Sequence, residues 1–177
     1  MGEYFYLVSS LPGLKPEGSI PISTKEFVET CARLMKKSDF ELLQAAMLNT
    51  VEIEPHQNDL IGRWQAYEYG LRNELVRLRA RKHSIDPESS LHQPFLNPQM
   101  AALAREIFDE ESPLKAEQRY IKVLWAALDE LQACQSFNLE YLMVYYLKLQ
   151  LLERKTLFRL DAGKQKLESI TRGELFS

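Results

Sequence analysis

The chain has 177 residues, of which 45% are hydrophobic and 27% charged, and its formal net charge is -3. A chain of this length and composition is expected to form one globular domain with a sizeable core. The small negative charge excludes a protein that binds nucleic acid or anionic membranes through overall positive charge.

The sequence also indicates a cellular compartment. Cys31 and Cys134 lie far apart without CxxC spacing, as expected for reduced thiols in the cytosol. The first residues lack the positive region and apolar run of a secretory signal, and Tyr6 stands where myristoylation requires Ser or Thr. The most apolar window, Leu139 to Leu152, contains Lys148 and is shorter than the roughly 20 residues of a membrane span. We therefore expect a cytoplasmic protein without a membrane span.

The first 22 residues are predicted to form an irregular N-terminal segment. Aromatic and β-branched residues between Tyr4 and Leu14 favour an extended conformation, and a short helix that ends before Pro12 is the alternative. Proline and glycine residues between positions 12 and 21 then predict a loop.

Two capping-box patterns follow, and each predicts the start of a short amphipathic helix. Ser23 precedes Glu26 by three residues, and Ser38 precedes Glu41 by the same spacing. In a capping box the serine and glutamate side chains each satisfy a free backbone N–H of the first turn. We expect a tight turn near Lys37 and Ser38 between the two helices.

A long helix is predicted from about Asn58 to Lys82, after a polar link at residues 52–57. Its apolar residues recur every three or four positions and therefore share one face: Leu60, Ile61, Trp64, Tyr67, Leu71, Leu75 and Leu78. Residues 84–97 contain two prolines and no periodicity, and Pro98 follows directly. We interpret residues 84–97 as a long flexible loop.

Two further helices are predicted where a capping residue precedes proline. Asn97-Pro98 and Ser112-Pro113 both place proline at the first position of a helix. Proline is well tolerated at that position. Residues 109–111 are acidic and lie between the two helices, and we interpret them as a solvated linker rather than a metal site.

The central element is a helix from Asn138 to Leu160. A helix that is apolar nearly all round is normally buried on several sides, and we expect this one to lie between the helices that carry Trp64 and Trp125. Its second half is expected to leave the core because it is charged at Glu153, Arg154, Lys155 and Arg159. Gly163 predicts a stop, and a short helix is expected at residues 164–170.

These elements predict an all-α, single-domain bundle of about six to seven helices around the buried helix 139–160. Residues 71–76 and 147–152 have similar patterns and are both followed by basic residues. Two related helical hairpin modules would explain the similarity, and so would chance.

The sequence contains no group of residues typical of catalysis. His56, His83 and His92 lie in or beside predicted loops, without a second His or Cys at metal-ligand spacing. No phosphate-binding loop, nucleophile elbow or HExxH motif occurs. We therefore predict no catalytic, cofactor-binding or metal-binding residue, and a protein that is not an enzyme.

One end of the long helix carries a run of basic residues. This run complements the helix dipole whatever its function, and it is also a candidate surface for contact with an acidic partner. The candidate partner-contact residues are Arg72, Arg77, Arg79, Arg81 and Lys82. RNA binding is a weaker alternative because no aromatic residue is interleaved among them.

Four segments resemble an uncharacterised bacterial family that is encoded among V-type ATPase genes. They are Tyr4–Pro12, Leu71–Ala80, Ser112–Glu117 and Tyr145–Arg154. That family is more remotely similar to the C-type subunit of V/A-type ATPases, whose eukaryotic counterpart is the d-type subunit. The pattern shared with the C-type subunit is Arg72-Asn73-Glu74-Leu75 leading to Arg79-Ala80-Arg81-Lys82.

The resemblance implies a fold and a role. The C-type subunits are all-helical funnels of three similar modules that couple the rotating central shaft to the membrane rotor. This chain is much shorter, which is compatible with fewer modules. The resemblance implies a non-enzymatic subunit or assembly partner in ion transport, bound to V-type ATPase subunits and peripheral at the inner membrane face. The alternative is a helical adaptor or regulator unrelated to the ATPase, with RNA bound through the basic helix end.

Overall fold

The computed structural model describes residues 4–48, 58–86, 98–133 and 135–171, with side chains as far as residue 158. Within these residues it contains seven helices and no strand, which confirms the predicted all-α bundle. The helices are α1 (Phe5–Ser10), α2 (Thr24–Leu34), α3 (Lys37–Ala45), α4 (Asp59–His83), α5 (Pro98–Phe108), α6 (Pro113–Gln132) and α7 (Leu139–Thr171).

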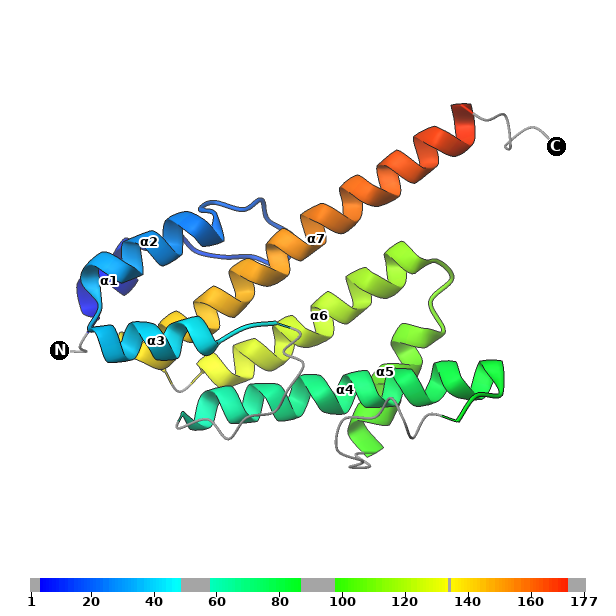
Figure 1. The fold of residues 1–177 in the computed structure, drawn as a ribbon, viewed down its shortest axis with the longest axis horizontal. Coiled ribbons are helices and arrows are strands. Elements are labelled where there is room, and N and C mark those ends of the chain that lie inside the picture. The colour runs from blue at the N-terminus through cyan, green and yellow to red at the C-terminus, as the bar shows by residue number, and fades with distance from the viewer. Residues whose placement is uncertain (1–3, 49–57, 87–97, 134, 172–177) are drawn as a thin grey trace.

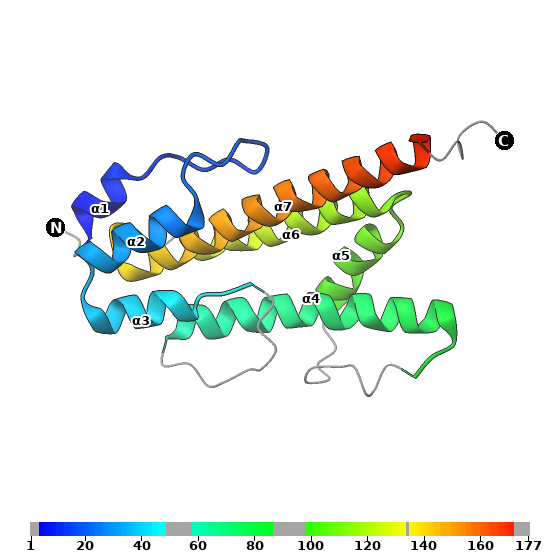
Figure 2. The same cartoon turned by 45° about the horizontal axis from the view of Figure 1, so that its top comes forward.

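The long helices set the shape of the molecule. α6 and α7 form an antiparallel pair, and α4 lies on the far side of α6, linked to it by the crossing helix α5 (Figures 1 and 2). α2 and α3 pack on the first half of α7, with α1 above them (Figure 2). The last turns of α7 extend past the rest of the bundle (Figure 1).

The central part of α7 is buried as predicted. Leu142, Leu147, Leu149 and Leu151 have no exposed surface. The predicted contact with the Trp125 helix is also confirmed, since α6 packs along α7. The Trp64 helix packs less closely on α7 than predicted: α4 packs chiefly on α5 and then on α6, and Nδ2 of its cap Asn58 donates to Oε1 of Glu140 on α7 at 3.5 Å. The amphipathic helices α2 and α3 cover that side of α7 instead.

Polar side chains in the middle of α7 bind neighbouring elements. Lys148 donates from Nζ to Oδ1 of Asp129 on α6 at 2.6 Å. Gln150 meets the end of α3, where its Nε2 donates to the carbonyl of Ala46 at 2.9 Å and its Oε1 accepts from the amide of Leu48 at 3.1 Å. These bonds satisfy two polar side chains that the apolar helix brings into the bundle.

The charged residues that follow also bind neighbours, contrary to the prediction that the helix leaves the core at this point. The Glu153 carboxylate accepts from the backbone amide of Thr24 at 2.9 Å and from its hydroxyl at 2.6 Å, at the first residue of α2. Arg154 pairs with Glu117 of α6, and Lys155 is buried, with only 7% of its surface exposed. α7 therefore stays attached to the bundle as far as Lys155, through contacts with α2, with α6 and with the N-terminal loop.

The N-terminal segment forms a helix, so the extended alternative for residues 4–10 is wrong and the short-helix alternative is right. The amide of Tyr4 donates to the carbonyl of Phe137 at 3.0 Å, which ties the start of α1 to the chain just before α7. Leu7 and Val8 are buried in the core. Tertiary burial thus overrides the extended preference of these side chains. The rest of the segment, up to Ser23, is irregular as predicted.

The two predicted capping boxes have different outcomes. Ser23 caps α2, and the reciprocal bonds with Glu26 are both present. Ser38 does not cap α3, because the turn lies at Met35 and Lys36 and the helix has begun by Lys37. Ser38 therefore lies inside the first turn, where its hydroxyl donates to Asp39 at 3.1 Å.

Other predicted helix boundaries are close to those observed. Asn58 caps α4, Ser112 caps α6, and the side chain of Asn138 accepts from the amide of Tyr141 at 3.1 Å. The predicted stop at Gly163 is wrong, since α7 continues to Thr171. Glycine inside a helix costs only about 1 kcal/mol, and the residues after it are good helix formers. The predicted helix 164–170 is therefore the end of α7.

Some predictions fall on residues that the structure does not describe. These are the polar link 52–57, His56, most of the loop 84–97 with His92, the cap Asn97, Cys134 and the side chain of Arg159.

Candidate binding groove

A groove of about 480 Å³ lies where α4, α5, α6 and α7 approach one another. Three arginines from two helices line it, together with one glutamate and a largely apolar wall. The lining residues are Arg72, Leu75, Val76, Arg79, Ile107, Pro113, Ala116, Glu117, Tyr120, Arg154 and Phe158.

One wall of the groove is a face of α4. Arg72, Val76 and Arg79 follow one another at spacings of four and three, which places them on one side of a helix. Arg72 is half-buried, with its guanidinium carbon 6.0 Å from the ring centre of Tyr69. Its Nη1 is buried and has no hydrogen-bond partner within the described residues. Arg79 is exposed and also lines the groove.

The opposite wall contains an ion pair between α7 and α6. Nε of Arg154 donates to Oε1 of Glu117 at 2.5 Å, and Nη2 donates to Oε2 at 3.2 Å. The Arg154 guanidinium also lies 5.1 Å from the ring centre of Tyr120. Burial disfavours its charge, but the hydrogen bond and attraction from Glu117, together with the charges of Tyr120 and Glu68, outweigh burial and raise the pKa of Arg154. Arg154 therefore remains a cation whose carboxylate partner is already engaged.

Tyr120 contributes an aromatic surface that stays neutral. Burial, followed by the nearby charge of Glu68, raises the pKa of the Tyr120 phenol to about 12. The groove therefore combines three cations, one engaged carboxylate and neutral apolar surface. Such a lining is suited to binding an anion, and none of its described residues is a Ser, Cys or His that could act as a nucleophile.

The structure separates the five predicted partner-contact residues. Arg72 and Arg79 line the groove, whereas Arg77 forms an ion pair with Glu74 of the same helix. Arg81 is exposed, and the amine of Lys82 lies 5.6 Å from the ring centre of Phe108 on α5. The basic run thus supplies two groove residues and three that lie elsewhere.

Sequence reasoning misses the residues that complete the groove. The prediction has the helix leave the core at Arg154, and it gives neither Glu117 nor Tyr120 a role in a site. These residues lie on α6 and α7, far from α4 in the sequence. The only signal in the sequence is that the charged Arg154 follows an apolar stretch of helix. This signal indicates that Arg154 needs a partner but does not identify Glu117.

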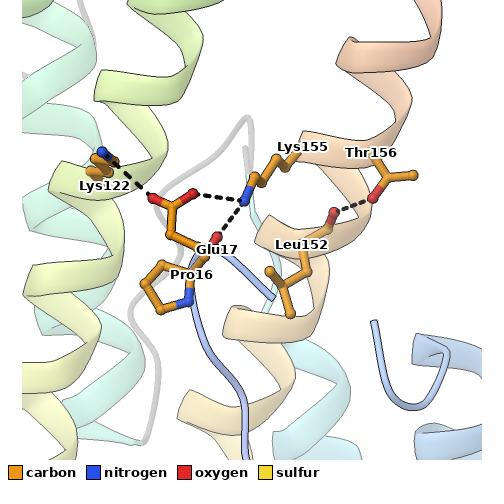
Figure 3. Close-up of polar contacts among 6 residues, drawn as sticks. All are labelled: Pro16, Glu17, Lys122, Leu152, Lys155 and Thr156. Carbon is orange, nitrogen blue, oxygen red and sulfur yellow. Dashed lines mark hydrogen bonds and ion pairs between the residues drawn. The ribbon is translucent and has the colours of Figure 1, made fainter. Parts of the chain in front are cut away.

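A second polar cluster holds the N-terminal loop against α6 and α7 (Figure 3). The buried amine of Lys155 donates to the carbonyl of Pro16 and lies 3.5 Å from Oε2 of Glu17. The other carboxylate oxygen of Glu17 lies 3.5 Å from Nζ of Lys122 on α6. Lys155 and then Lys122 lower the pKa of Glu17. These contacts attach the N-terminal loop to α6 and α7, and this structural role explains the charged residues of the cluster.

Neither a metal site nor a membrane span occurs among the described residues. No group of three or more His, Cys, Asp or Glu residues there is placed to hold a metal ion. None of the described helices combines the length and the apolar character that a membrane span requires. Comparison with known proteins found no matching family model, curated protein or solved structure.

Proposed function

We propose that this chain is a non-enzymatic docking protein of a V-type ATPase, either a subunit or an assembly partner, on the cytoplasmic side of the membrane sector. Its role is to bind other subunits between the central stalk and the rotor. The resemblance of residues 71–80 and 145–154 to proteins encoded with such ATPases supports this proposal. The all-helical architecture, which the C-type subunits also have, supports it as well.

The structural observation that carries the proposal is the extension of α7 past the bundle (Figure 1). The helix has 33 residues and is therefore about 50 Å long, whereas its partner α6 has 20 residues. Toward the extension Leu157 is 63% exposed, although it lies on the same helix as the fully buried Leu149. An exposed apolar residue close to a helix end that leaves its own bundle is suited to docking in a groove of a partner.

The experiment compares two exposed leucines. Affinity-tagged chain is expressed in cells that produce it naturally, and the ATPase subunits that co-purify with it are quantified by mass spectrometry. We expect Leu157→Asp to reduce their recovery severalfold. The matched control is Leu34→Asp, because Leu34 on α2 is 61% exposed but lies away from the extension. Absence of ATPase subunits from the wild-type sample contradicts the proposal, and equal recovery with both variants contradicts the role of the extension.

A further inference from the structure

We infer that the groove between α4, α5, α6 and α7 is a binding site for a small organic anion, a carboxylate or phosphate ester that carries an apolar group. This inference does not depend on the ATPase proposal. It rests on the charge of the groove, on a lining arginine that has one nitrogen without a hydrogen-bond partner among the described residues, and on the size and apolar wall of the groove.

The charge of the groove is opposite in sign to that of the chain. The lining has three arginines and one carboxylate, which gives a local charge of +2, whereas the chain has a formal net charge of -3. The carboxylate of Glu117 already accepts two bonds from Arg154. It is therefore less available to neutralise Arg72 and Arg79 on the opposite wall. Buried Glu68 on α4, whose charge acts on Tyr120 and Arg154, reduces this positive charge but leaves three arginines against two carboxylates around the groove.

The unsatisfied donor is Nη1 of Arg72, which is buried without a hydrogen-bond partner among the described residues. Burying a charged donor without an acceptor is costly, and most buried polar groups are bonded. The planar guanidinium presents paired N–H groups that match the two oxygens of a carboxylate or phosphate. Nη1 has almost no exposed surface, so an anionic ligand would supply its acceptor once the half-buried Arg72 side chain turns toward the groove.

The remaining wall determines the size and character of the ligand. A volume of about 480 Å³ lies within the range of small-molecule pockets, about 300–1,000 Å³. Leu75, Ile107, Tyr120 and Phe158 give it apolar and aromatic surface away from the arginines. Inorganic phosphate alone would leave that surface unfilled. A ring or branched group attached to the anion would cover it, which is why we assign an organic ligand.

The test is isothermal titration calorimetry of the purified full chain with defined probes at low salt. The probes are phenyl phosphate, benzoate, inorganic phosphate, the neutral analogue benzyl alcohol, and a short acidic peptide of Glu and Asp. We expect saturable binding of phenyl phosphate, benzoate or both, weaker binding of inorganic phosphate, and none of benzyl alcohol. Preference between the two aromatic anions identifies the head group.

Two matched variants test the location. Arg79→Gln removes a groove cation, and we expect it to weaken binding about tenfold, the loss expected for a charge-assisted hydrogen bond. Arg81→Gln removes an exposed cation from the same helix that does not line the groove, and binding should remain within about twofold of wild type. A third variant, Ala116→Phe, fills the groove without changing its charge and should abolish binding. Circular dichroism verifies that each variant is folded.

Several results would overturn the inference. Failure of both aromatic anions to bind at millimolar concentration would do so, as would equal binding of benzyl alcohol or inorganic phosphate. Equal weakening by Arg79→Gln and Arg81→Gln would mean that general surface charge is responsible. Binding of the acidic peptide alone would make the groove a protein-docking surface and not a small-molecule site.

Discussion

Substitution of Leu149 by alanine tests the packing of α7 most sharply. The Leu149 side chain has no exposed surface. The change removes three carbons, which at about 0.8 kcal/mol each amounts to about 2.4 kcal/mol of lost burial. The cavity that remains adds a further cost, so we expect a loss of about 2.5–5 kcal/mol in the free energy of unfolding. That is a large part of the roughly 5–15 kcal/mol typical of a domain.

The assay is urea denaturation followed by circular dichroism. Leu157→Ala is the matched control, because it makes the same chemical change two turns later on the same helix at a side chain that is 63% exposed. It should change the free energy of unfolding by no more than about 0.5 kcal/mol. Leu149→Asp should prevent folding, since it places a charge in the same site. Equal effects of the two alanine variants would refute the buried placement of this part of α7.

Four further predictions concern individual contacts. Ser23→Ala should cost about 1 kcal/mol of stability in thermal or urea melts because it removes a helix cap, whereas Ser38→Ala should cost almost nothing; equal losses would contradict the corrected start of α3. Lys155→Ala should still fold but lose about 1–3 kcal/mol in the same melts, since it removes a buried donor; a neutral result would contradict its burial. Glu17 has a pKa lowered from 4.5 in the folded state, so its contribution is present above that pH and is lost as the pH falls through the folded value. The stability difference between wild type and Glu17→Gln should therefore disappear in acid. A difference that grows in acid would contradict the lowered pKa of Glu17. Burial raises the pKa of Cys31 to about 12, so peptide mapping after alkylation at pH 8 should find Cys31 modified only in urea; rapid labelling without urea would contradict its burial.

Local signals predict most of the helix starts. Asn58 and Ser112 are recognisable because a cap bonds to amides two or three residues away, a distance that sequence spacing specifies. Ser38 has the same pattern but does not cap, because the chain turns two residues earlier and Lys36 starts the helix without a side-chain cap. Gly163 does not end α7 for a related reason: glycine permits a left-handed helix end but does not impose one.

The candidate site is only partly predictable. Arg72 and Arg79 can be identified because their charges lie in one run of sequence. The partner of Arg154 cannot, because Glu117 is 37 residues away and no periodicity specifies which helices become neighbours. Lys155 is misplaced for the same reason, since Glu17 in the loop that it binds is 138 residues away. Charge patterns predict that a helix needs polar partners, but the tertiary packing determines which ones.

The central functional claim is that the chain takes part in a V-type ATPase, and deletion of its gene tests this most directly. The ATPase is purified under mild conditions from cells with and without the gene, and its subunit composition and ATP-driven ion transport are measured. The proposal predicts an incompletely assembled or uncoupled complex in the deletion strain, with recovery when the wild-type chain is restored. A complex that is fully assembled and equally active without this chain would contradict the proposal.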